Sequence, residues 1–179
     1  VSFPSRRLML CTFGNFRAEI MLYETPELAI LPSIRDGSVF ASLESLAEDV
    51  RLYGHYGGIR LLKAAIKCFH DHCREEGIAL HDRNFTVRYQ TDIPNLVGLA
   101  GSSAIITACL RALMTFYGVD IPRPRLANLI RDVENRELGI PAGLQDRVAQ
   151  VYQGLVHMDF DRDFMTRHGH GRYEPLDPA

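Results

Sequence analysis

The sequence lacks several features that would mark a specialised class of protein. Its 20 lysine and arginine residues do not exceed its 22 aspartate and glutamate residues, and the formal net charge is -2 at pH 7. Nucleic-acid-binding domains usually carry a basic excess, so we expect no nucleic-acid partner. No run of about 18 apolar residues is present, which argues against a membrane-spanning helix. With 46% hydrophobic and 23% charged residues, the composition is typical of a soluble globular protein.

Targeting and disulfide signals are also scarce. The first residues lack the long apolar segment of a secretory signal and an initiator methionine, so we expect a piece of a longer, cytoplasmic protein. The four cysteines form no CxxC pair, and reduced thiols are the default inside cells. One cluster invites a zinc interpretation: Cys68, His70, His72 and Cys73. On a helix only the first and third of these share a face, so the four would not converge on one ion.

The pattern of apolar residues predicts a chain of mixed strands and helices. Strands are expected at 15–24 and 84–91 from their alternation, at 27–32 as a partner strand, and at 155–160. Helices are expected at 42–52, 58–77 and 102–117, from the prolines at 122 and 124 to about 137, and from 144. Strands come first and helices mixed with strands follow, which favours an α+β fold over a doubly wound sheet.

The most informative stretch is the glycine-rich loop Pro94–Ala104, which lies between an expected strand and an apolar helix. Gly98 and Gly101 allow the backbone to approach a ligand closely, and the first turn of a helix leaves free N–H groups with a partial positive charge. Ser102 and Ser103 add hydroxyl donors, so the loop predicts an anion site with phosphate as its natural occupant. The loop has neither GxxxxGK[ST] nor GxGxxG, and a tight turn with an N-cap is the alternative interpretation.

The loop resembles the PxxxGLGSSA-type ATP phosphate motif of the GHMP kinases, with Ala100 as one extra residue before Gly101. Its GLxGSSA form looks like the glucuronokinase branch of that family. Further stretches similar to that branch lie at 56–62, 137–152 and 154–160, and the similarity runs over about residues 12–175. The resemblance implies that ATP is bound by Pro94, Gly98, Leu99, Ala100, Gly101, Ser102, Ser103 and Ala104.

The resemblance also implies a fold and a domain organisation. We expect residues 1–160 to form a two-layer α+β domain of the ribosomal protein S5 domain 2-like type. Residues 161–179 are expected to be a polar tail leading to a C-terminal, ferredoxin-like domain that is absent from this chain. The chain has no clear copy of an earlier family motif that positions the acceptor, and it ends before a later glycine-rich motif. We therefore expect little kinase activity from this chain alone.

Two carboxylates follow the loop, Glu134 near the end of an expected helix and Asp146 after GIPAG. A phosphoryl-transfer enzyme must hold Mg²⁺, neutralise the phosphates and position the acceptor hydroxyl. In galactokinase-like relatives a helix glutamate ligates Mg²⁺ and an aspartate after a glycine-rich turn is the presumed base. The resemblance therefore implies that Glu134 and Ser103 bind Mg²⁺ and that Asp146 is the catalytic base. From the residues alone, Glu134 could lie on a solvated helix face and Asp146 could form an ion pair with Arg147.

A sugar acid substrate would need a partner for its carboxylate, and a planar guanidinium suits a carboxylate best. Arg147 is the first candidate because it adjoins the presumed base, and Arg60 is the second. Gln145 and Tyr56 could donate hydrogen bonds to hydroxyls. Each of these residues could instead be structural, and Arg60 could face solvent on its helix.

Together these features predict an ATP- and Mg²⁺-dependent sugar-1-kinase of carbohydrate metabolism. We expect the complete protein to convert D-glucuronate to glucuronate 1-phosphate. Another sugar or sugar acid, such as galacturonate or galactose, is an alternative acceptor because the phosphate machinery would be shared. A truncated domain that binds nucleotide without turnover is an alternative of a different class.

Overall fold

The computed structural model describes residues 7–12, 16–33, 36, 42, 57–94 and 98–176. The chain divides into two compact units, and each is described by itself. The central unit comprises residues 16–119, and the terminal unit combines residues 1–15 with residues 120–179. No helix in the described part of the chain is long and apolar enough to cross a membrane.

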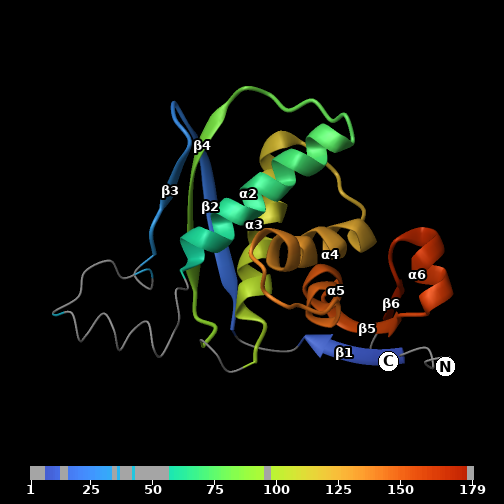
Figure 1. The fold of residues 1–179 in the computed structure, drawn as a ribbon. Coiled ribbons are helices and arrows are strands. Elements are labelled where there is room, and N and C mark those ends of the chain that lie inside the picture. The colour runs from blue at the N-terminus through green and yellow to red at the C-terminus, as the bar shows by residue number, and fades with distance from the viewer. Residues whose placement is uncertain are drawn as a thin grey trace. The chain divides into compact units, whose positions relative to one another are not determined.

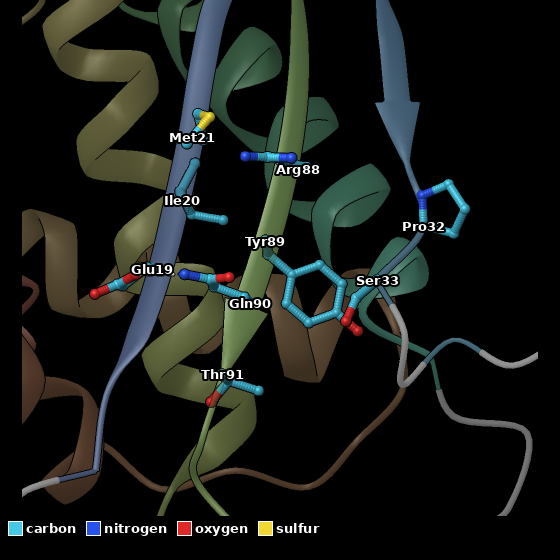
Figure 2. A pocket seen from close by; sticks show the side chains of 9 residues that line it. All are labelled: Glu19, Ile20, Met21, Pro32, Ser33, Arg88, Tyr89, Gln90 and Thr91. Atoms are coloured by element: carbon cyan, nitrogen blue, oxygen red, sulfur yellow. Dashed lines mark hydrogen bonds between the residues drawn. The ribbon is translucent and has the colours of Figure 1, made fainter.

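The central unit is a three-stranded sheet with two helices on one of its faces (Figures 1 and 2). Its elements are β2 (Ala18–Thr25), β3 (Ala29–Leu31), α2 (Gly58–Glu75), β4 (Asn84–Thr91) and α3 (Gly101–Tyr117). Strand β4 is the middle strand, antiparallel to β2 and parallel to β3. Alternate β4 side chains such as Phe85 and Val87 are buried, as are Leu62 and Phe69 of α2 and Ile106 of α3. This pattern forms a two-layer core, because successive strand side chains point to opposite faces.

The terminal unit has its own antiparallel sheet and its own helices. Its elements are β1 (Arg7–Thr12), α4 (Arg123–Asp132), the π-helical turn η1 (Val133–Glu137), α5 (Gln145–Tyr152), β5 (Gly154–Asp159), α6 (Arg162–His168) and β6 (Arg172–Leu176). Strand β5 lies between β1 and β6 and is antiparallel to both. Helix α5 packs against α4 and against the β1–β5 side of the sheet. Ile130, Val148, Val156 and Met158 are fully buried in this unit.

Most of the expected elements are confirmed by the structure. Strand β4 has the predicted bounds, and helices α2 and α3 begin and end within two residues of the predicted positions. Gly118 ends α3 in the left-handed conformation that glycine favours (φ 67°). The expected 27–32 strand exists as β3, but it pairs with β4 and not with the 15–24 strand. The helix expected at 42–52 lies almost wholly outside the described residues.

The segment after residue 160, expected as a polar tail, contains two further elements of secondary structure. Helix α6 and strand β6 follow residue 160, and β6 completes the sheet by pairing with β5. Helix α6 buries none of its residues, and its N-terminus is capped by the Asp161 side chain, which accepts from the Phe164 N–H at 2.8 Å. Without a buried face, such a helix leaves no apolar period in the sequence. Strand β1 also escaped prediction.

The carboxylate of Asp36 connects three segments of the central unit: the chain just after β3, the start of α2, and β4. Asp36 accepts the Gly58 N–H at 2.7 Å and the Tyr89 hydroxyl at 2.8 Å through Oδ1, and the Ser33 N–H at 2.8 Å through Oδ2. The N-cap residue Gly57 has no side chain that could accept a hydrogen bond from the first turn of α2. Asp36, which lies 22 positions before Gly58 in the sequence, accepts the hydrogen bond of the Gly58 N–H instead. Burial, together with the neighbouring Asp36 carboxylate, raises the pKa of Tyr89 to about 12.

Tyr89→Phe is expected to change how stability depends on alkaline pH. The folded pKa of Tyr89 lies above the ordinary value of 10.0. The neutral phenol therefore stabilises the fold fully below about pH 10, and this contribution is lost as the pH rises to about 12. Two pKa units correspond to about 2 to 3 kcal/mol. Denaturant unfolding at pH 9 and pH 12 should show wild type losing more stability than the variant. Tyr23→Phe, at an exposed position, is the control, and equal losses for wild type and Tyr89→Phe would contradict the prediction.

Gly58→Ala is expected to destabilise the protein. A Cβ at Gly58 would lie 1.9 Å from Cζ of Tyr89, so the ring must move and its hydrogen bond to Asp36 is disturbed. Such overpacking typically costs about 1 to 3 kcal/mol. Thermal and denaturant unfolding measure the loss. Gly101→Ala is a matched control, because its Cβ meets only Ile93 Cγ2 at an ordinary 3.4 Å.

Candidate functional site

The glycine-rich loop enters helix α3 through two left-handed residues. Gly98 has φ 76° and Ala100 has φ 54°, and Ala100 is the N-cap of the helix that begins at Gly101. A non-glycine residue in this region costs about 1 to 2 kcal/mol, and such conformations are concentrated at functional sites. Alanine has no side-chain acceptor for the N–H groups of the first turn. The start of α3 therefore has the chemistry of an anion site.

Packing does not explain the glycine at position 101. An added Cβ there would touch only Ile93, at 3.4 Å, which is an ordinary contact. Gly98, in contrast, has a positive φ that disfavours other residues. Leu99 and Pro94 are exposed, Ser102 is half-buried, and residues 95–97 lie outside the described part of the chain.

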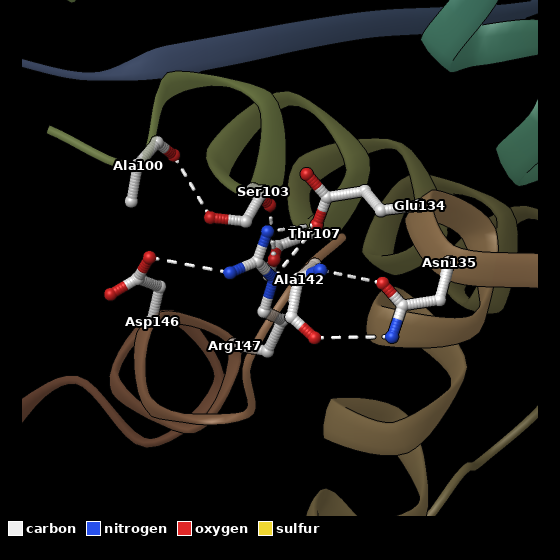
Figure 3. A network of polar contacts seen from close by, with 8 residues as sticks. All are labelled: Ala100, Ser103, Thr107, Glu134, Asn135, Ala142, Asp146 and Arg147. Carbon is white, nitrogen blue, oxygen red and sulfur yellow. Dashed lines mark hydrogen bonds and ion pairs between the residues drawn. The ribbon is translucent and has the colours of Figure 1, made fainter. Parts of the chain in front are cut away.

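The hydroxyl of Ser103 is directed back toward the helix start. Ser103 Oγ donates to the carbonyl oxygen of Ala100 at 2.9 Å, and Thr107 Oγ1 donates to the carbonyl oxygen of Ser103 at 2.6 Å (Figure 3). Ser103 is fully buried, and its neighbour Ala104 is also buried. These bonds hold the first turn rigidly, while the lone pairs of the Ser103 hydroxyl oxygen remain able to accept or ligate.

In the terminal unit, one guanidinium contacts both predicted carboxylates (Figure 3). Arg147 Nε donates to Glu134 Oε2 at 2.7 Å, and Nη2 donates to the same oxygen. Arg147 Nη1 donates to Asp146 Oδ2 at 3.2 Å. The side chains of Glu134 and Arg147 are 1% and 9% exposed, whereas that of Asp146 is 49% exposed. The solvated helix face considered for Glu134 is therefore wrong, and the ion pair considered for Asp146 and Arg147 is present.

The π-helical turn η1 places Glu134 in this cluster. Its wider winding is closed by the Leu138 N–H, which donates to the Val133 carbonyl oxygen at 3.2 Å, and the Ile140 N–H donates to the Glu134 carbonyl oxygen at 2.7 Å. Such turns are rare and often occur at functional sites. The turn orients the carboxylate of Glu134 toward α5 and anchors the loop that leads to Asp146.

Asn135 secures the same loop, and sequence reasoning missed it. Its side-chain amide donates to the Ala142 carbonyl oxygen at 3.1 Å and accepts the Ala142 N–H at 2.6 Å, a paired contact like that between two strands (Figure 3). An asparagine near a helix end is common, so nothing in its spacing identified this role. Fixing Ala142 fixes the direction in which α5 begins.

The remaining predicted residues lie at separate places. Arg60 is exposed in the first turn of α2, and Tyr56 lies outside the described residues. Gln145 is the first residue of α5, and its Oε1 lies 2.5 Å from where a Cβ on Gly143 would be. In the described part of the chain, no three His, Cys, Asp or Glu side chains gather as metal ligands. The structure thus brings together Glu134, Asp146 and Arg147, while Arg60 stays on another helix.

A hollow of about 730 Å³ lies in the central unit, beside the end of β3 (Figure 2). It is lined by Glu19, Ile20, Met21, Pro32, Ser33, Arg88, Tyr89, Gln90 and Thr91. Glu19 is paired with Arg17 at 2.7 Å and accepts from Gln90 at 2.7 Å. None of these residues was predicted to belong to a site.

Comparison with known proteins identifies the family. The sequence model of the GHMP kinases N terminal domain matches residues 60–154, more than half of the chain. The chain is 47% identical over 174 residues to "Glucuronokinase 1" of Arabidopsis thaliana, covering 96% of this chain and 48% of that protein. It is 48% identical over 175 residues to "Probable glucuronokinase 2" of the same plant, with the same coverage. The chain therefore spans about half the length of the curated relatives it matches.

Solved structures share the fold. A D-glycero-D-manno-heptose 1-phosphate kinase from Bacteriodes thetaiotaomicron superposes with a TM-score of 0.70 at 18% identity, over 98% of this chain and 52% of that one. The phosphomevalonate kinase of Streptococcus pneumoniae gives a TM-score of 0.64 at 15% identity, over 98% and 52%. These likenesses confirm the expected α+β class. With the match over residues 60–154, they show that the chain belongs to the GHMP kinase family and carries its N-terminal domain.

Proposed function

We propose that the full-length protein is an ATP-dependent sugar-1-kinase, acting in the cytoplasm, that phosphorylates the anomeric hydroxyl of D-glucuronate to give glucuronate 1-phosphate. The observation that carries the proposal is the similarity to two plant glucuronokinases over 96% of this chain. The carboxylate–guanidinium cluster on η1 and α5 supports it, because it supplies residue types that phosphoryl transfer requires.

The loop from Pro94 to Ala104 would bind the phosphates of ATP. The N–H groups in the first turn of α3 have a partial positive charge, and Ala100 offers them no side-chain acceptor. In such a setting, negative charge that develops on the transferring phosphoryl group is stabilised without reorganisation of the protein. The conformation at Gly98 and Ala100 supports this role, since it turns the chain sharply into the helix.

The residues present suit Mg²⁺ bound together with a nucleotide. Mg²⁺ prefers oxygen ligands and usually takes one or two carboxylates in addition to substrate phosphates and water. Glu134 offers a buried carboxylate, one oxygen of which is held by Arg147, and Ser103 offers a hydroxyl oxygen. From the family resemblance, we propose Glu134 of the terminal unit and Ser103 of the central unit as protein ligands. The ion would neutralise phosphate charge when it is bound.

Asp146 would act as the base. It is half-exposed at the start of α5, and Arg147 holds its Oδ2. The anomeric oxygen would attack the γ-phosphorus as the bond from that phosphorus to the bridging oxygen breaks. The electron pair of that bond leaves with ADP, and the hydroxyl proton passes to the Asp146 carboxylate. Arg60, Tyr56 and Gln145 are the proposed partners of the sugar.

A panel of acceptors tests the substrate. Full-length protein is assayed for ADP release with glucuronate, galacturonate, glucose and galactose, and the product is identified by phosphorus NMR. The proposal expects the highest kcat/KM with glucuronate and a phosphate on the anomeric oxygen. Preference for another sugar would support the alternative acceptors instead. ATP binding without turnover on any of them would overturn the proposed activity.

Ser102→Asp is expected to weaken ATP binding without destabilising the fold. A carboxylate in the first turn of α3 interacts favourably with the helix N-terminus, by about 0.3 to 1 kcal/mol. The same charge about 4 Å from a phosphate is repelled by about 1 to 4 kcal/mol, so the Kd for ATP should rise about tenfold or more. Calorimetry and thermal unfolding measure both effects. Ser102→Asn is the neutral control, and an unchanged Kd in Ser102→Asp would remove the loop from phosphate binding.

Asp146→Asn is expected to lower kcat by about 10²- to 10⁴-fold, the usual worth of general-base catalysis. Its ion pair with Arg147 is half-exposed and should contribute less than about 1 kcal/mol, so the melting temperature should scarcely change. The Kd for ATP should also stay near the wild-type value. A variant with kcat within a few-fold of wild type would show that Asp146 is not the base.

A further inference from the structure

We propose that Arg147 is a positioning residue for Asp146 and does not bind the substrate carboxylate. This inference rests on the proposed function, because it concerns how the proposed base is held. It assigns to one guanidinium the task of orienting a catalytic carboxylate from a buried anchor. The anchor is Glu134, and the oriented group is Asp146 (Figure 3).

The geometry of α5 and the anchoring of Arg147 support this role. Adjacent residues of a helix project about 100° apart and do not normally face each other. The contact between Asp146 and Arg147 therefore depends on where the long arginine side chain is held. Glu134 holds it, since one carboxylate oxygen accepts from both Nε and Nη2. With Nε and Nη2 fixed, the planar guanidinium has Nη1 directed to Asp146 at 3.2 Å.

The burial of the Glu134–Arg147 pair also disfavours a substrate partner for Arg147. Arg147 is buried in the fold, with a side chain 9% exposed, against a Glu134 side chain that is 1% exposed. All three of its guanidinium nitrogens already donate to the two carboxylates. A sugar carboxylate that replaced Glu134 as the partner would leave that buried negative charge without its cation, which is strongly unfavourable. The guanidinium is better suited to hold a protein carboxylate than to capture one from solution.

Asp146 itself is held through one of its two carboxylate oxygens. Its Oδ2 accepts from Arg147, and its Oδ1 has no hydrogen bond in the described part of the chain. The side chain is 49% exposed, so Oδ1 is accessible. An aspartate held by one oxygen presents the other in a fixed direction, which is the requirement for accepting a hydroxyl proton.

A double-mutant cycle tests the inference in the full-length protein. Arg147→Lys keeps the positive charge beside Glu134 but lacks the planar fork that reaches two carboxylates. Displacing a reacting group by about 1 Å can cost on the order of 100-fold, so Arg147→Lys should lower kcat about 10- to 100-fold with little change in KM for glucuronate. In an Asp146→Asn background the same change should lower kcat less than about twofold, because the residue acts through Asp146. Arg136→Lys is the matched control, an exposed arginine paired with Asp132 at 3.4 Å, and should leave kcat unchanged.

Each other outcome contradicts the inference in its own way. A raised KM for glucuronate with unchanged kcat would show that Arg147 binds the substrate. Equal losses of kcat in both backgrounds would show that Arg147 acts independently of Asp146. Wild-type protein that phosphorylates none of the sugars would overturn the proposed function, and this inference with it.

A second measurement leaves Arg147 intact, in case Arg147→Lys does not fold. Nitrogen-15 NMR of labelled arginine follows the exchange of the Arg147 side-chain protons with water. We expect the Nη1 protons to be protected in wild type and to lose protection in Asp146→Ala, which removes the acceptor, while the Nε proton stays protected by Glu134. Protection of Nη1 that does not depend on Asp146 would overturn the inference.

Discussion

The terminal unit depends on the ion pair between Glu134 and Arg147. A carboxylate that is almost fully buried needs a charged partner, and losing that partner typically costs about 3 to 5 kcal/mol. The pair ties the π-helical turn to α5, and the two hydrogen bonds of Asn135 fix the loop between them. The arrangement of Asp146 follows from this anchor, because the same guanidinium contacts it.

Elements with strong local patterns were predictable from the sequence. The apolar residues of β4 alternate along the strand, with Phe85, Val87 and Tyr89 buried, and α3 is largely apolar and ends at a left-handed glycine. Strand pairing is less local, and β3 lies parallel to β4 although the strand next to it in sequence is β2. Elements without a buried face, such as α6, leave no period to detect.

The candidate site was predictable only in part. Family resemblance pointed to Glu134 and Asp146, and adjacency suggested that Asp146 could pair with Arg147. The ion pair between Glu134 and Arg147 joins residues 13 positions apart across an irregular loop. A helical spacing in the sequence therefore could not predict it. The same holds for Asp36, whose partners Gly58 and Tyr89 come from distant segments. Polar contacts of this kind are set by the assembled fold, and single residue types do not encode them.

The conformation at Ala100 has a consequence for the durability of the proposed anion site. A left-handed residue followed directly by a right-handed helical one turns consecutive main-chain N–H groups toward a common point, forming the concave arrangement known as a nest. In a nest, main-chain N–H groups bind the anion, and side chains are not required. Replacing the exposed side chain of Leu99 leaves every donor in place, whereas a change in φ at Ala100 disperses them all. Such a site tolerates drift in side-chain identity while it constrains backbone shape.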